Sequence, residues 1–129
     1  MQPLDSSDKK IAVISELLYL ANLLILPGIA FLVLTRLFVK YRKNSSDFAR
    51  SHLTQTFYAS LVGGFLIVII VTGVLLFGGF EGVYIWMWVI LYFTLVHSTL
   101  VVFGALGLAK AMSSQSWQYP LFGRYFPKD

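Results

Sequence analysis

The sequence predicts an all-α polytopic membrane protein, and three observations support this fold class. Residues 56–77 and 83–109 contain no Asp, Glu, Lys or Arg. Each run can cross a hydrocarbon core of about 30 Å, which takes about 20 helical residues. Only the short segment 78–82 separates the two runs. Of the 129 residues 57% are hydrophobic and only 12% are charged, whereas soluble domains average about 25% charged residues. The two runs therefore predict an antiparallel transmembrane hairpin.

The first hydrophobic segment, residues 11–39, is broken by Leu26-Pro27-Gly28. Pro27 lacks an N–H group and clashes with the carbonyl four residues earlier, so a helix must kink or stop there. In one interpretation residues 17–35 form a single kinked span, which would rise about 28 Å. In the other, Pro27-Gly28 is the turn of a short helical hairpin. Length favours the kinked span, because residues 28–35 rise only about 12 Å before Arg36. The prediction is three to four helices.

Charge predicts the topology of a single integral membrane domain over residues 1–129, which we place in a bacterial inner membrane. Residues 40–52 form the most basic stretch and are expected on the cytoplasmic side. The loop 78–82 carries one acid, Glu81, and no base, so it is expected on the opposite side. Glu16 and Arg36 are interpreted as boundary residues whose charged groups reach headgroup water. We interpret the positive residues behind the formal charge of +4 as determinants of membrane topology, so no nucleic-acid partner is expected.

Small residues cluster near the inner ends of the two predicted spans. Side chains of this size let helix backbones approach closely. We expect them to pack within the hairpin, with a dimer face as the alternative. The predicted helix-packing residues are Ala59, Gly63, Gly64, Gly104 and Gly107.

His97 lies inside the predicted span 83–109, and intramembrane ionisable residues call for a functional hypothesis. The simplest account is a neutral histidine hydrogen-bonded to a neighbouring helix. The alternatives are haem or metal ligation and a role in binding a proton or another ligand. His52 is the only other histidine, but it lies near the inner surface, whereas His97 stands about 18 Å along its helix from Ala109. We therefore expect no cofactor and no metal, and we expect bound lipid near the basic stretch.

The segment 110–129 is expected to form an interfacial aromatic tail. Aromatic side chains favour membrane interfaces and protein interfaces, where a large area is buried at low entropy cost. The residues expected to contact a partner or an interface are Trp117, Tyr119, Phe122, Arg124, Tyr125 and Phe126.

Three short motifs carry a resemblance to a known family. They are the Leu26-Pro27-Gly28 break, the stretch from Phe48 to Gln55 with its histidine-x-x-glutamine pattern, and the ending that runs from Ala109-Lys110-Ala111 to Tyr119-Pro120-Leu121. Over residues 11–126 the chain resembles small bacterial membrane proteins related to the channel component of the chloroplast inner-envelope protein-import machinery. The resemblance implies an all-helical membrane fold. It also raises the weight of the hairpin interpretation, because the plastid relative has four helices.

The sequence predicts a non-enzymatic role. No glycine-rich phosphate loop, serine–histidine–acid order or pair of carboxylates is present, and there is no cysteine. The leading hypothesis is a small accessory or structural subunit of a larger membrane protein complex, in contact with lipids. One alternative, implied by the resemblance, is a component of a protein-import or translocation pore. The other is a b-type haem or metal-binding electron carrier that uses His97.

The predicted topology can be tested with single cysteines introduced at Ser45 and at Gly79. Because the two positions lie on opposite sides of the membrane in this prediction, an impermeant thiol reagent should label only one of them in intact cells. Equal labelling of both variants, with permeabilised cells as the control for reactivity, would contradict the topology.

Overall fold

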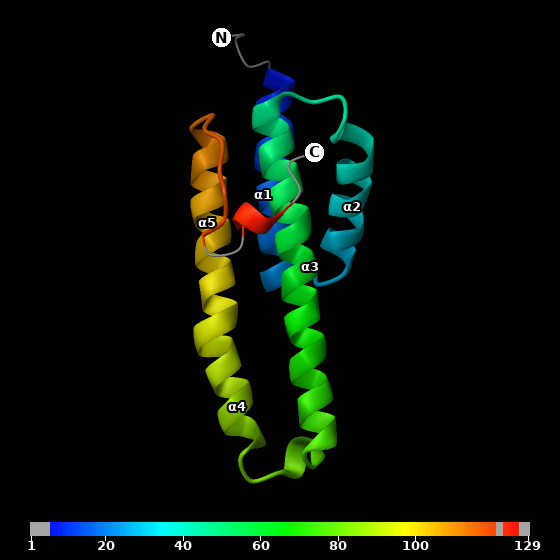
Figure 1. Ribbon diagram of the computed structural model, residues 1–129, viewed down its shortest axis with the longest axis vertical. Coiled ribbons are helices and arrows are strands. Elements are labelled where there is room, and N and C mark those ends of the chain that lie inside the picture. Colours follow the sequence, from blue (N-terminus) through cyan, green and yellow to red (C-terminus); the bar gives the residue numbers. More distant parts are fainter. Residues whose placement is uncertain (1–5, 121–122, 127–129) are drawn as a thin grey trace.

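The computed structural model describes residues 6–120 and 123–126, and no strand occurs among them. Four helical rods make up this described part of the chain (Figure 1). The first three are α1 (Ser6–Leu24), α2 (Ile29–Tyr41) and α3 (Asp47–Leu76). The fourth, called the α4–α5 rod here, joins α4 (Ile85–Leu91), the π-helical turn η2 (Tyr92–His97) and α5 (Ser98–Met112). Two 3-10 turns, η1 (Gly79–Glu81) and η3 (Gly123–Tyr125), complete the described elements.

The break in the first hydrophobic segment is the turn of a helical hairpin. Gly28 has a φ of +88°, a conformation that residues with a side chain rarely adopt. Its N–H group donates to the side-chain oxygen of Asn22 at 2.8 Å, which fixes the turn. The preferred interpretation of residues 17–35 as one kinked span is therefore wrong. The length argument failed because it ended both arms at charged residues, whereas α1 runs through Glu16 and α2 runs through Arg36.

Two of the rods are long and apolar enough to cross a membrane, namely Asp47–Leu76 and Ile85–Met112. Helix α3 has 30 residues, so it rises about 45 Å and exceeds a hydrocarbon core of about 30 Å. Its first turns, up to about Thr56, are the polar part of the helix. The α1–α2 hairpin flanks the N-terminal part of α3, including these polar turns, whereas the C-terminal part of α3 extends past the hairpin beside the α4–α5 rod (Figure 1).

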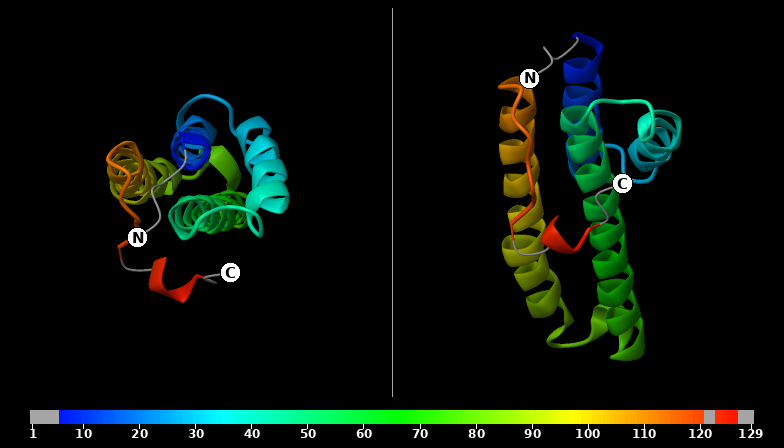
Figure 2. Two further views of the ribbon diagram at one scale, coloured as in Figure 1. Left: turned by 90° about the horizontal axis from the view of Figure 1, so that it is seen from above. Right: turned by 45° about the horizontal axis from the view of Figure 1, so that its top comes forward.

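Helix α1 lies between α3 and α5 (Figure 2, left), and it packs extensively against both, whereas α3 and α5 touch each other little. Glycines on α5 permit this close approach. A Cβ atom at Gly104 would lie 2.6–2.7 Å from ring atoms of Tyr19 and from a methyl group of Leu20. The small residues of α5 therefore face α1 rather than α3.

The N-terminal end of α1, the α2–α3 connection and the end of α5 gather at one end of the molecule, and the loop 78–82 lies at the other (Figure 1). Helix α3 starts at an N-cap, Ser46, whose hydroxyl accepts from the Ala49 N–H group at 3.2 Å. The Ser46 N–H group in turn donates to the Asp8 carboxylate at 3.3 Å, which ties the connection to α1. After α5 the chain reverses at Ser114, with a φ of +56°, and runs back along the helices (Figure 2, right).

The close packing of α1 on α5 predicts different outcomes for two Gly→Ala changes. Gly104→Ala should lower the free energy of unfolding by about 1–3 kcal/mol, because the new methyl group overlaps the Tyr19 ring. Gly64→Ala is the matched control on α3, where a Cβ atom would meet nothing within 4 Å. Thermal unfolding of both purified variants in mild detergent measures the difference. Equal midpoints for the two variants would show that α1 and α5 do not pack as described.

Candidate functional site

A polar cluster lies in the interior, where α1, α3 and the C-terminal segment meet. It consists of Glu16, His52 and Tyr119, and we call it the Glu16 cluster. Glu16 and His52 are 0% exposed and Tyr119 is 1% exposed. Burying a carboxyl group is unfavourable unless hydrogen bonds and an opposite charge compensate. The contacts around Glu16 therefore decide whether the fold tolerates it.

His52 is bonded through both ring nitrogens. Its Nε2 lies 2.7 Å from the carbonyl oxygen of Gln115, and because a carbonyl can only accept, Nε2 carries a proton and donates it. Its Nδ1 lies 2.7 Å from Oε1 of Glu16. One proton lies between Nδ1 and Oε1, so one of these two atoms donates it and the other accepts it. The same ring thus links α1 to the segment that follows α5.

The C-terminal segment is held by hydrogen bonds that reach across the whole chain. The Tyr119 hydroxyl donates to Oε2 of Glu16 at 3.0 Å, and the Tyr119 N–H group donates to Oε1 of Gln55 at 3.0 Å. The Gln55 amide then donates to the Gly123 carbonyl at 3.2 Å. The Ser51 hydroxyl donates to the Trp117 carbonyl at 3.0 Å. One face of the first turns of α3 therefore binds the returning chain.

Space for the Glu16 carboxylate comes from a glycine on α5. A Cβ atom at Gly107 would lie 2.6 Å from Oε2 of Glu16. Tyr19 follows Glu16 by about one turn of α1, and its hydroxyl donates to the Leu100 carbonyl at 3.0 Å. The Tyr19 ring meets the Tyr119 ring edge-on, with ring centroids 5.5 Å apart. Three helices, α1, α3 and α5, and the C-terminal segment thus each contribute a contact to the cluster.

Burial governs the ionisation of the two acids in the cluster. Burial raises the pKa of Glu16 above its usual range, although the His52 ring and the Tyr119 hydroxyl act in the opposite direction. Burial and the neighbouring Glu16 charge raise the pKa of Tyr119 well above its usual value. Tyr119 therefore stays a hydrogen-bond donor throughout the physiological pH range.

The interpretation of Glu16 as a boundary residue in headgroup water is wrong, since its carboxyl group is fully buried and bonded. A charge near the end of an apolar run resembles a boundary residue in sequence. The two residues that hydrogen-bond to its carboxyl group, His52 and Tyr119, lie 36 and 103 residues away in the sequence. The histidine-x-x-glutamine pattern was visible in the sequence, but its role in binding the C-terminal segment was missed.

The structure places the predicted helix-packing residues mainly around α1. Ala59 packs with Tyr19 and Tyr119. Gly63 faces Leu23 of α1 and Leu100 of α5 at ordinary contact distances, whereas Gly64 faces open space. Gly104 and Gly107, as described above, face α1.

His97 lies far from His52, at the end of the π-helical turn η2. Its ring packs on Phe93 with centroids 5.3 Å apart. It lines an apolar cavity of about 700 Å³ between α3, the α4–α5 rod and the turn of the α1–α2 hairpin. Within residues 6–120 and 123–126, no group of three or more His, Cys, Asp or Glu residues is placed to hold a metal ion.

The tail residues divide into two sets. Trp117, Tyr119 and Phe126 pack into the core cluster around Tyr19, so this part of the tail contacts the chain's own helices. Arg124 and Tyr125 are exposed and contact each other, with the guanidinium 4.9 Å from the ring centroid. The predicted contact residue Phe122 lies outside the described residues.

The shared bonds of His52 predict a large effect of its removal. His52→Ala should lower the free energy of unfolding by about 3–5 kcal/mol, because it leaves the Glu16 carboxyl group buried without its partner. His97→Ala is the matched control and should cost at most about 1.5 kcal/mol, since it removes a ring contact with Phe93 and leaves no buried carboxyl group without its partner. Thermal or denaturant unfolding in mild detergent distinguishes them. Similar losses in both variants would contradict a supporting role for the cluster.

Comparison with known proteins gives one match. Residues 7–126 match the model of the MamF/MmsF family, the magnetosome magnetite crystal formation protein family. No curated protein and no solved structure matches the chain. The match corrects the resemblance to the chloroplast protein-import channel component, because this family is not related to it. Together with the two long apolar rods, it identifies an integral membrane protein. The chain belongs to the magnetosome magnetite crystal formation protein family.

Proposed function

We propose that this chain is a non-enzymatic protein of the magnetosome membrane, which supports magnetite crystal formation as a small subunit of a larger membrane assembly. The observation that carries the proposal is the family match. It extends from residue 7 to residue 126 and so includes all four helical rods and the returning C-terminal segment.

The non-enzymatic part of the proposal is supported by the closure of the Glu16 cluster. A general acid or base must reach the proton that it transfers. Glu16 and His52 have no exposed surface, and both nitrogens of His52 already bond to oxygen atoms of the chain. The cluster is therefore suited to joining segments rather than to acting on a substrate.

The subunit role is supported by the distribution of apolar surface. Beyond the α1–α2 hairpin, α3 exposes large apolar side chains such as Phe65 at 66% and Leu75 at 66%. The groove between α3 and the α4–α5 rod is also mainly apolar in its lining. Inside a bilayer such surfaces contact lipid chains or other transmembrane helices, which pack on them without loss of hydrogen bonds.

The orientation follows from the end of the molecule at which the bases gather. Lys9 and Lys10 of α1 share that end with the basic connection between α2 and α3 (Figure 1). The positive-inside rule then places this end in the cytoplasm. Because α1 and α2 form a hairpin, the N-terminal lysines and the basic connection lie on the same side in this orientation, and the loop 78–82 faces the interior of the magnetosome.

The proposal is tested by complementation in a magnetite-forming bacterium that lacks the gene. Wild-type protein is expressed at graded levels, and crystal size is measured by electron microscopy against the amount of protein in the magnetosome membrane. Glu16→Gln and His52→Ala variants are measured in the same way. We expect both variants to fall on the wild-type curve, because they change crystal growth only through the amount of folded protein.

Two results would overturn parts of this function. A variant that reaches wild-type abundance but gives no crystals would assign a chemical role to the cluster and contradict the non-enzymatic proposal. Crystals of normal size and number in the deletion strain would contradict the role in crystal formation. Purification in mild detergent tests the subunit role, which fails if the chain elutes alone at the mass of a single protein-detergent particle.

A further inference from the structure

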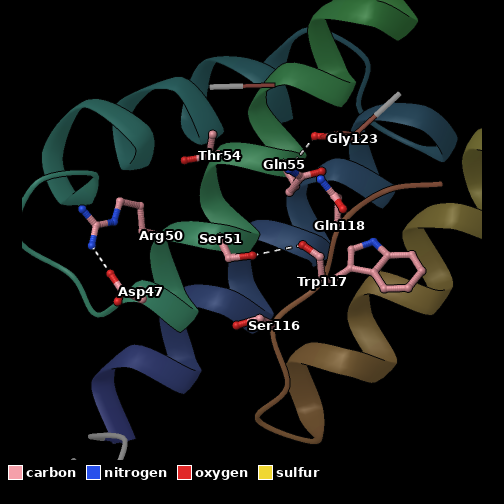
Figure 3. Close-up of a pocket in the computed structure, with 9 residues that line it drawn as sticks. All are labelled: Asp47, Arg50, Ser51, Thr54, Gln55, Ser116, Trp117, Gln118 and Gly123. Atoms are coloured by element: carbon pink, nitrogen blue, oxygen red, sulfur yellow. Dashed lines mark hydrogen bonds and ion pairs between the residues drawn. The ribbon is translucent and has the colours of Figure 1, made fainter. Parts of the chain in front are cut away.

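A polar pocket of about 510 Å³ lies between the first turns of α3 and the returning C-terminal segment (Figure 3). It is separate from the Glu16 cluster and opens to the surroundings. Arg50 and Thr54 lie on one side of it and Trp117 and Gln118 on the other, with Ser51 and Gln55 between them (Figure 3). Asp47, Ser116 and Gly123 complete the lining.

Two side chains of this pocket have buried polar atoms with no hydrogen-bond partner among the described residues. The hydroxyl of Thr54, a residue that is 2% exposed, and the indole N–H group of Trp117 are both in this state. A buried polar group without a partner destabilises a fold by about 1–3 kcal/mol. Since both residues line the same pocket, a ligand that accepts hydrogen bonds there would satisfy them.

The positive charge of Arg50 favours a ligand whose hydrogen-bond acceptors are anionic. Arg50 stands one helical turn before Thr54, and its guanidinium pairs with Asp47. The Asp47 side chain is 97% exposed, and exposed ion pairs of this kind contribute little stability. The guanidinium can therefore exchange this partner for another anion. Its planar set of N–H groups matches the oxygen atoms of a phosphate particularly well.

We propose that this pocket binds a polar headgroup that carries a phosphate, with Arg50 and Thr54 as partners of the phosphate on one side and with the Trp117 N–H group as a hydrogen-bond donor to the rest of the headgroup on the other side (Figure 3). The hydroxyls of Ser51 and Ser116 and the amide of Gln118 line the remainder, which is larger than a bare phosphate needs. The residues of α3 that line the pocket belong to the polar end of this helix, and that end adjoins the basic connection (Figure 1). That is the level at which a candidate span meets lipid headgroups, so a phospholipid and a soluble phosphate compound are the two sources. This site goes beyond the proposed function and does not depend on it.

The test uses the full-length protein, purified in a neutral detergent without added phospholipid. Inorganic phosphate, phosphatidylglycerol in mixed micelles and phosphatidylcholine in mixed micelles are titrated at constant ionic strength, and binding is followed by the shift in the thermal unfolding midpoint. We expect saturable stabilisation by inorganic phosphate if the ligand is soluble, and by phosphatidylglycerol if it is a lipid headgroup.

Three variants identify the site. Arg50→Gln should weaken binding about tenfold or more, because a charge-assisted hydrogen bond is lost. Thr54→Val should weaken it several-fold without lowering the unfolding midpoint of the ligand-free protein, because its hydroxyl has no partner within the described chain. Arg36→Gln removes the same charge from the exposed face of α2 and should bind like the wild type.

The proposal is overturned if none of the three probes stabilises the protein. It is equally overturned if Arg50→Gln binds as well as Arg36→Gln does, since any stabilisation would then be a general effect of charge. A loss of midpoint in ligand-free Thr54→Val would show that the hydroxyl supports the fold and would remove it from the site.

Discussion

The buried carboxyl group of Glu16 is the constraint on which the rest of this structure depends. In the interior it would destabilise the fold unless it found a partner for each oxygen atom. One oxygen is met by the His52 ring and the other by the Tyr119 hydroxyl. Satisfying a single side chain therefore requires α1, α3 and the C-terminal segment to meet at one point, and Gly107 to leave room for them on α5. The apolar spans set where the helices lie relative to a membrane, whereas this polar contact sets how they are joined.

This division explains how much of the fold could be predicted from the sequence. The two uncharged runs and the loop between them were visible, because length and hydropathy are local properties. Helix α3 itself begins at Asp47, nine residues before the uncharged run that starts at Thr56. The α1–α2 hairpin was not preferred, because its turn depends on a contact between Asn22 and Gly28 that apolar length does not reveal. The position of α1 between α3 and α5 was missed for a similar reason: small residues show that something packs closely, but not which helix does so.

The site could be predicted less well than the fold. His52 was considered only as a weak cofactor ligand and Glu16 only as a boundary residue, since each was judged by its neighbours in the sequence. Their role is to bind each other across α1 and α3. Reading the charges of each segment on its own does not reveal a pair formed between two helices. The aromatic tail was expected at an interface. The structure shows that Tyr119 serves the chain's own core, because a phenol at this position supplies both an apolar ring and a donor for the buried carboxylate.

The distance in sequence between Glu16 and Tyr119 has a consequence for biogenesis. The two residues are 103 positions apart, so the bond between them can form only when nearly all of the chain has left the ribosome. Until His52 emerges, α1 carries an acidic group with no counterpart, and it cannot take its final place between α3 and α5. Helix α1 can therefore reach its final place only after α3, α5 and Tyr119 have been made, although it is synthesised first.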